Sequence, residues 1–169
     1  MKFGEDLLAQ SKLLARHEAR RPRQTTLRRA VSTAYYALFH LLTEESARFL
    51  IAGDAKKPLR QQVQRAFDHG AMRQCCRAFS GGALPAAIAP LSPVPVSPEL
   101  RLVAQAFVTL QDARHIADYD VAISYSRSYA VSLIDVTEAA FAAWRAIRTT
   151  DEARVFLVSL LLWRQWNRT

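Results

Sequence analysis

The sequence has little of what builds disulfide or metal scaffolds, with only two cysteines and four histidines in 169 residues. Cys75 and Cys76 are adjacent, which excludes a disulfide framework and a four-cysteine zinc site and suits small apolar side chains on a helix. The histidines lie on four separate segments without His-x-x-x-His or Glu-x-x-His spacing. No Gly-x-x-x-x-Gly-Lys loop and no Gly-x-Ser-x-Gly occurs. The sequence therefore predicts neither a bound metal nor a cofactor.

Long hydrophobic runs are also missing. The apolar stretch 155–163 is nine residues long, whereas a membrane-spanning helix needs about twenty. No basic start followed by an apolar run resembles a signal peptide. Half of the residues are hydrophobic and 22% are charged, which is enough apolar material for the core of one domain. We expect a cytoplasmic protein that makes no membrane contact.

The charge is strongly unbalanced, with a formal net charge of +8. The excess of basic residues lies in the first 98 residues, apart from one charge at the C-terminal end. Such a field favours polyanions, which for a cytosolic protein means nucleic acid above all. The alternative is a compositional bias, because arginine outnumbers lysine 19 to 4, as a GC-rich genome would produce.

Strand signals are missing as well, because the sequence has no period-two alternation and no Asn-Gly or Asp-Gly turn. Helical spacing occurs throughout, and it predicts an all-α, up-and-down bundle of five to six helices. The third helix is expected to bend near His69 and Gly70, and Thr25 or Thr26 to cap the second, which is the central and most buried one. The expected helices cover residues 5–20, 25–51, 58–79, 99–118, 124–148 and 151–166.

The domain organisation follows from one break in this pattern. Residues 80–98 contain two glycines and five prolines, so they form an apolar crossover loop that lies against the helices. Residues 1–150 then make the bundle, and residues 151–169 add an apolar helix that packs on the bundle or on a dimer partner. Because this last helix is more apolar than a surface helix requires, we expect a homodimer.

Two segments concentrate polar and aromatic residues. In residues 28–40, two arginines open the helix and Tyr35, Tyr36 and a histidine follow, either as core side chains or as part of a site. In residues 112–120, one arginine stands among three aspartates beside a histidine and a tyrosine. Its four-residue spacing to Asp118 is that of an ordinary helix ion pair. The alternative is a polar cluster at a helix end that meets a phosphate.

These segments resemble the HEPN (higher eukaryotes and prokaryotes nucleotide-binding) family. The likeness rests on Arg29 with Ala-Tyr-Tyr-Ala-Leu-Phe-His at 34–40, on Arg-Ala-Phe-Asp-His-Gly at 65–70, and on Arg114 with Ala-Asp-Tyr-Asp at 117–120. The first segment is the most specific. The resemblance implies a helical bundle that commonly dimerises and acts on RNA, in some members as a toxin paired with a small nucleotidyltransferase antitoxin.

The family's active members carry an arginine, often followed by Asn, Asp or His, and a second histidine four to six residues further on. Arg114 and His115 match the first two positions, but the residue that follows Arg114 after four intervening residues is Tyr119, and after six it is Val121. In the family's metal-independent cleavage, a histidine moves protons for the attacking RNA 2′-hydroxyl while the arginine steadies the phosphate. An ordinary tyrosine, with a pKa of about 10, is a poor base at neutral pH.

Three functions remain open from the sequence. The first is a nucleotide- or RNA-binding protein with this degenerate motif, within a toxin–antitoxin or defence-type system. The second is a metal-independent endoribonuclease toxin, with Arg114, His115 and Tyr119 as the catalytic candidates. The third is a helical protein-interaction module without enzymatic activity. The candidate contacts to nucleotide or RNA are Arg28, Arg29, His69, Arg73 and Arg114.

Overall fold

The computed structural model describes residues 2–18, 20–53, 56–81, 83–92 and 95–166. Within these ranges the chain is all α-helical and contains no strand, which confirms the expected fold class. The described residues form seven α-helices rather than the expected five or six. They are α1 (Lys2–Arg16), α2 (Gln24–Leu50), α3 (Lys57–Arg65), α4 (His69–Gly81), α5 (Pro98–Tyr119), α6 (Arg127–Ile147) and α7 (Asp151–Trp166).

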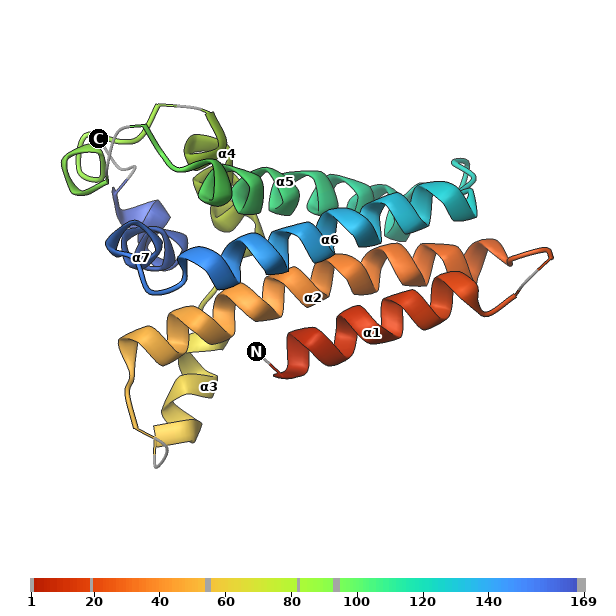
Figure 1. The fold of residues 1–169 in the computed structure, drawn as a ribbon, viewed down its shortest axis with the longest axis horizontal. Helices are drawn as coiled ribbons and strands as arrows, with labels where there is room; N and C mark the ends of the chain where they lie inside the picture. The colour runs from red at the N-terminus through yellow and green to blue at the C-terminus, as the bar shows by residue number, and fades with distance from the viewer. Residues whose placement is uncertain (1, 19, 54–55, 82, 93–94, 167–169) are drawn as a thin grey trace.

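Four long helices, α1, α2, α5 and α6, form a bundle in which successive helices alternate in direction (Figure 1). Helix α2 lies at its centre and packs against α1, α3, α5, α6 and α7, as expected from the sequence. The close approach of α1 to α2 depends on Gly4, where a Cβ atom would lie 2.8 Å from the Ala37 carbonyl oxygen. The bundle thus holds α2 in place from several sides.

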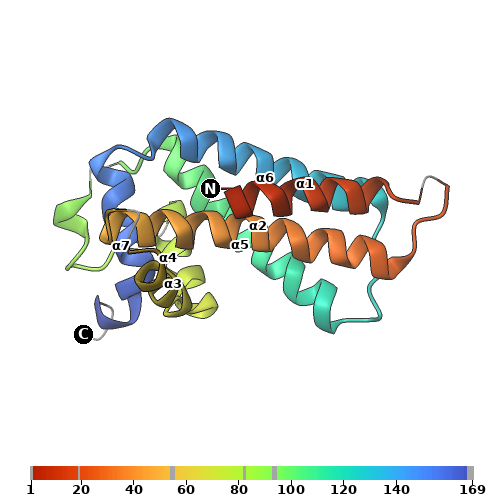
Figure 2. The ribbon, with the colours of Figure 1, turned by 90° about the horizontal axis from the view of Figure 1, so that it is seen from below.

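The single helix expected over 58–79 is two helices. Helix α3 ends at Arg65 and α4 begins at His69, where the Asp68 carboxylate accepts a hydrogen bond from the Ala71 backbone N–H at 2.8 Å. This is the bond that an N-capping aspartate makes, so Asp68 starts a new helix where a bend was expected. Figure 2 shows α1 and α3 on opposite sides of α2.

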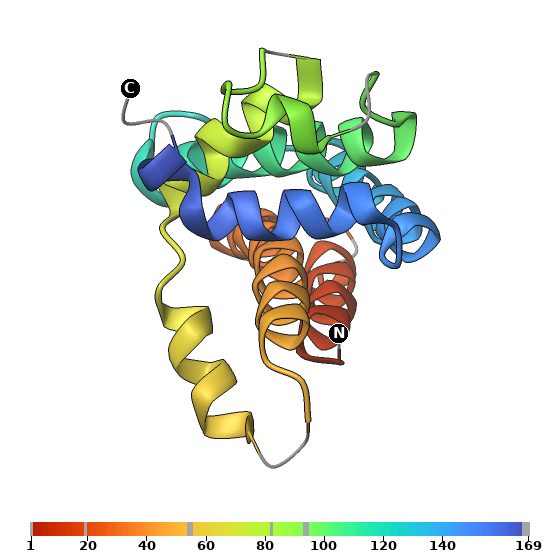
Figure 3. The same cartoon turned by 90° about the vertical axis from the view of Figure 1, so that its left-hand side faces the viewer.

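Helix α7 closes the core of the same chain. It lies across the ends of the long helices (Figure 3) and packs against α2 and α4. Its Phe156 is fully buried, with ring centroids 5.1 Å from Phe79 and 6.3 Å from Trp144. Helix α7 therefore packs on the bundle of its own chain, and residues 167–169 of the expected segment 151–169 lie outside the described residues. These apolar side chains were the reason to expect a homodimer, which stays a prediction.

The crossover between α4 and α5 contains a short 3-10 helix, Ala89–Leu91, and its other described residues, 83–88, 92 and 95–97, are irregular. Ile88 is fully buried, so this part of the crossover packs against the helices as its apolar composition indicated. Ser97 caps α5 by accepting a hydrogen bond from the Leu100 N–H at 3.2 Å. The crossover thereby sets where α5 begins.

Candidate functional site

A row of polar residues at four-residue spacing winds along α2. Neighbours four apart lie nearly one above the other, and the row turns slowly around the helix because one turn takes 3.6 residues. It covers about 30 Å at 1.5 Å per residue. Most of these side chains are partly buried between α2 and neighbouring helices. We call this row the α2 polar ridge; its members are Arg28, Ser32, Tyr36, His40, Glu44 and Arg48.

Arg28, at the start of the ridge, holds the C-terminal end of α5. Its guanidinium donates hydrogen bonds to the carbonyl oxygens of Ala117 and Asp120 at 2.9 Å each, and to Ile123. Positive charge is favourable at a helix C-terminus, where carbonyl groups lack partners. Arg28 therefore has an architectural position, whereas Arg29 is exposed.

Arg114, on α5, lies against Tyr36 at the middle of the ridge and is held from several sides. Its Nε is 2.6 Å from Asp118 Oδ2, and its Nη2 donates a hydrogen bond to Tyr36 Oη at 3.0 Å. The guanidinium carbon lies 5.5 Å from the centroid of the Tyr36 ring and 5.7 Å from that of Tyr119, within range of cation–π attraction. Ser32 Oγ donates to Asp118 Oδ1 at 2.5 Å and so orients the carboxylate.

These contacts keep Arg114 charged. Burial by itself lowers the pKa of Arg114, but Tyr36 and Asp118 outweigh burial and raise the pKa above its usual value. A partly buried guanidinium with a fixed direction is suited to bind an anion in one geometry, because its donors form a planar fork.

Arg114 lines a pocket of about 430 Å³, the Arg114 pocket, which also receives His115 and Arg73. Arg73 forms an ion pair with Asp112 at 2.5 Å. His115 is exposed, and its ring centroid is 5.1 Å from that of Tyr119, which is 66% exposed. The structure thus brings together Arg73, Arg114 and His115, three of the residues selected from the sequence.

His69 lies behind this pocket rather than in its lining. Its Nδ1 is 2.5 Å from Tyr35 Oη, and its ring centroid is 4.3 Å from that of Phe39. Burial lowers the pKa of His69, and the charge of Arg114 lowers it further, while burial raises the pKa of Tyr35. The two groups are therefore neutral at neutral pH and hold α4 against α2.

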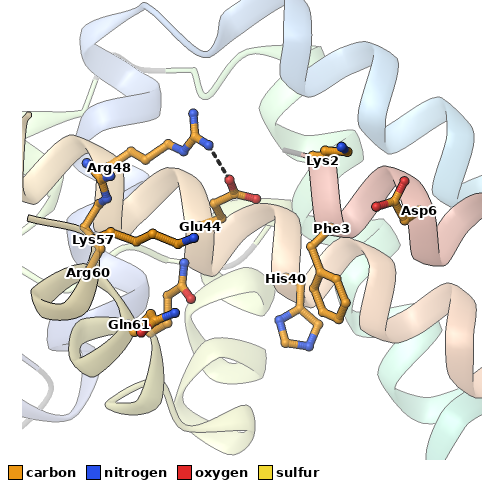
Figure 4. Close-up of a pocket in the computed structure, with 10 residues that line it drawn as sticks. Lys2, Phe3, Asp6, His40, Glu44, Arg48, Lys57, Arg60 and Gln61 are labelled. Atoms are coloured by element: carbon orange, nitrogen blue, oxygen red, sulfur yellow. Dashed lines mark hydrogen bonds and ion pairs between the residues drawn. The ribbon is translucent and has the colours of Figure 1, made fainter. Parts of the chain in front are cut away.

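Sequence reasoning missed a second hollow, between α2 and α3. This α2–α3 groove has a volume of about 530 Å³ and takes its walls from α1, α2 and α3 (Figure 4). Lys57 and Arg60 of α3 lie in it, together with His40 and Arg48 of the ridge. The basic excess of residues 54–98 was the one sequence feature that pointed to an anion site in this region. The groove itself could not be predicted, because a single helix over 58–79 was expected and α3 instead lies beside α2.

The structure offers no conventional metal or thiol chemistry in the described part of the chain. No group of three or more His, Cys, Asp or Glu side chains there is arranged to hold a metal ion. Cys75 and Cys76 are buried and unpaired, and burial raises the pKa of both thiols, which disfavours the reactive thiolate. Among the described residues, no helix combines the length and apolar character needed to span a bilayer.

No family model matches the sequence, and comparisons with curated proteins and with solved structures find no significant similarity. Function is therefore inferred from the two hollows along the ridge. The Arg114 pocket offers a fixed guanidinium beside a histidine. The α2–α3 groove offers a concentration of basic side chains.

Proposed function

We propose that this protein is an HEPN-like protein that binds RNA or a nucleotide, with Arg114 as its principal phosphate contact. The observation that supports the proposal is the convergence of Arg114, Arg73 and His115 on one pocket. The oriented guanidinium supplies two parallel donors for phosphate oxygens. The exposed ring of Tyr119 offers an apolar face beside it.

The acidic partners of the two arginines limit how tightly this pocket is expected to bind a phosphate. Asp118 and Asp112 already pair with Arg114 and Arg73, so a phosphate shares or displaces these carboxylates. Asp112 is about half exposed, with 49% of its side chain accessible, and a solvated ion pair of this kind is worth little. The Arg73–Asp112 pair is therefore easy to exchange, whereas the partly buried Arg114–Asp118 pair orients Arg114 and is retained.

A metal-independent endoribonuclease is the second candidate, and the position of His115 favours it. His115 follows Arg114 directly in the helix, where neighbouring side chains point about 100° apart, yet both line the same pocket. An imidazole there is placed to move the proton of an RNA 2′-hydroxyl while Arg114 stabilises the charged phosphate. Tyr119 occupies the position of the family's second histidine, and Tyr119→Phe tests its part in the reaction.

The first test is the affinity of the protein for a fluorescein-labelled single-stranded RNA in Arg114 variants. We expect Arg114→Lys, which keeps the charge but removes the planar fork, to weaken binding roughly tenfold. Arg114→Ala weakens it further. The matched control is Arg101→Ala, on an exposed arginine of the same helix that has no ion pair within the described ranges; its affinity stays within about twofold of wild type.

The outcome is interpreted together with the melting temperature of each variant. If Arg114→Ala lowers the melting temperature strongly and binds RNA as well as the wild type does, Arg114 is architectural and the proposal is wrong. Loss of RNA cleavage in His115→Ala with RNA binding retained would support the ribonuclease candidate. If the wild-type protein binds no RNA at low salt, the helical protein-interaction module remains.

The resemblance extends the proposal to partners. It implies a homodimer and pairing with a small nucleotidyltransferase antitoxin within a toxin–antitoxin or defence-type system. Growth arrest on expression of the protein alone, relieved by co-expression of such an antitoxin, is the expected result. Light scattering of the purified protein measures the oligomeric state directly.

A further inference from the structure

The α2–α3 groove carries an unbalanced charge. Three helices line it, and four of its ten lining side chains are basic while two are acidic. The basic side chains are those of Lys2, Arg48, Lys57 and Arg60, and the acidic ones are those of Asp6 and Glu44. A concave surface with an excess of one charge concentrates ligands of the opposite charge.

The partners of these cations leave a net positive charge on the lining of the groove. Arg48 pairs with Glu44 at 2.6 Å. Arg60 donates to the Gly53 carbonyl oxygen at 2.9 Å and to that of Ile51, and carbonyls fix its direction without neutralising its charge. Lys57 is exposed and has no ion pair within the described part of the chain. Lys57 and Arg60 therefore present two adjacent positive charges on the first turn of α3.

The opposite part of the groove is aromatic. The ring centroids of Phe3 and His40 lie 4.8 Å apart at 73°, and Phe3 is 55% exposed (Figure 4). Burial lowers the pKa of His40, and the neighbouring His69 lowers it further, so the imidazole is neutral at neutral pH. The groove thus combines an apolar aromatic face with a separate basic end.

Amide side chains of α3 connect the two parts. Gln61 and Gln64 line the groove, and both also line a smaller hollow of about 260 Å³ together with His40 and Arg65. Each amide offers donors and an acceptor, which matches the mixed hydrogen-bonding edge of a nucleobase. The groove volume of about 530 Å³ lies in the range of sites for small ligands.

We propose that the α2–α3 groove is a second binding site, separate from the Arg114 pocket, that takes a nucleoside phosphate. The phosphates lie against Lys57, Arg60 and Arg48, and the base lies against the Phe3 ring within reach of Gln61. The ligand is either a free nucleotide or one nucleotide of an RNA strand, since both present the same groups. The proposal rests on the groove residues alone and does not require that Arg114 bind anything.

The test is isothermal titration calorimetry of the full chain at low salt with ADP, with inorganic pyrophosphate, and with a single-stranded RNA hexamer. Lys57→Glu reverses one charge on an exposed side chain, and an acidic residue suits the first turn of a helix. We expect this variant to weaken ADP and pyrophosphate binding roughly tenfold or more. The control Arg101→Glu carries the same charge change outside the lining of either hollow and changes binding about twofold or less.

Phe3→Ala separates the base from the phosphates. Because Phe3 is exposed, this change leaves the melting temperature close to that of wild type. It is expected to weaken ADP binding roughly fivefold and to leave pyrophosphate binding unchanged, since stacking involves the base alone. In the Arg114→Ala background, where the other proposed site lacks its phosphate contact, tighter binding of the hexamer than of ADP identifies an RNA strand as the groove ligand, and equal binding identifies a free nucleotide.

Three results would overturn the proposal. The first is no saturable ADP binding by the wild-type protein. The second is an effect of Lys57→Glu no larger than that of Arg101→Glu. The third is an ADP affinity unchanged by Phe3→Ala, which would leave an anion site without a nucleoside. If Arg114→Ala abolishes hexamer binding while Lys57→Glu changes neither ADP nor hexamer binding, the groove proposal is wrong and the proposed function stands. If Lys57→Glu weakens ADP binding while Arg114→Ala changes neither ligand's binding, the groove proposal stands and the proposed function is wrong.

Discussion

Tyr35 and His69 form a polar pair between α2 and α4 that ties the stability of the fold to pH. Burial lowers the pKa values of His69 and of His40, which lies on α2. In the unfolded chain both return to an ordinary value of about 6.5. The unfolded state therefore binds protons first as the solution is acidified, and the free energy of unfolding falls in that window.

We expect full stability above a pH of about 6.5 and a progressive loss as the pH falls from there toward the lowered pKa values of the folded state. Urea unfolding at pH 7.5 and pH 5.5 measures this loss, because most carboxylates titrate at lower pH. His69→Gln removes one of the two groups and is expected to reduce the difference between the two midpoints. Equal midpoints for the wild type at both values would contradict the prediction.

Only some of the residues of the candidate site could be predicted from the sequence. The order Arg114-His115 and the nearby Arg73 are visible in the sequence, and the structure places all three in one pocket. The four-residue spacing of Arg114 and Asp118 also indicated the ion pair that they form. The hydrogen bond from Arg114 to Tyr36 joins residues 78 positions apart, and no local pattern reports a contact of that kind.

At the scale of elements, α7 is part of the core rather than an appendage. Phe156 is fully buried against Phe79 and Trp144, so Phe156→Ala removes a ring and leaves a cavity. We expect a loss of about 3–5 kcal/mol in the free energy of unfolding, measured by urea denaturation. The control Arg154→Ala removes an ion pair between Arg154 and the 91% exposed Asp151, and is expected to cost less than about 1 kcal/mol.

The result bears on the predicted homodimer. If Phe156→Ala lowers the free energy of unfolding no more than Arg154→Ala does, Phe156 is not packed within its own chain in solution. Deletion of residues 151–169 would expose the apolar side chains that α7 covers, so we expect the shortened protein to unfold or aggregate. A shortened protein that melts as the wild type does would contradict the packing of α7 seen in the structure.

The helices themselves were largely predictable because 3.6-residue periodicity marks each amphipathic segment. The ends were less so. The break before α4 had a local signal in Asp68, the capping residue. The expected bend was placed at Gly70 instead, two residues too late. The expected cap of α2 at Thr25 or Thr26 was wrong: the helix begins after Arg23, and the Gln24 side chain bonds the backbone of Tyr125 at 2.9 and 2.7 Å. That contact spans 101 residues, beyond the reach of any capping rule.

In the molecule as a whole, the excess basic residues occupy two kinds of position. Several arginines are used in the fold, as when Arg28 caps α5 and Arg148 pairs with the buried Glu45 at 3.1 Å. Others line the two hollows along the α2 polar ridge. Net charge alone therefore overstates the charge available to a ligand.

A bound RNA strand that contacts Arg114, Arg48, Lys57 and Arg60 neutralises about four phosphates. For single strands the logarithm of affinity falls with the logarithm of salt at a slope of about 0.7 per phosphate, so four contacts predict a roughly fifty-fold loss between 50 and 200 mM salt. Fluorescence anisotropy of a labelled single strand measures the slope, and Lys57→Glu is expected to make it shallower by about one contact. If affinity does not change with salt, phosphate contacts do not drive binding, and the basic residues are a feature of composition.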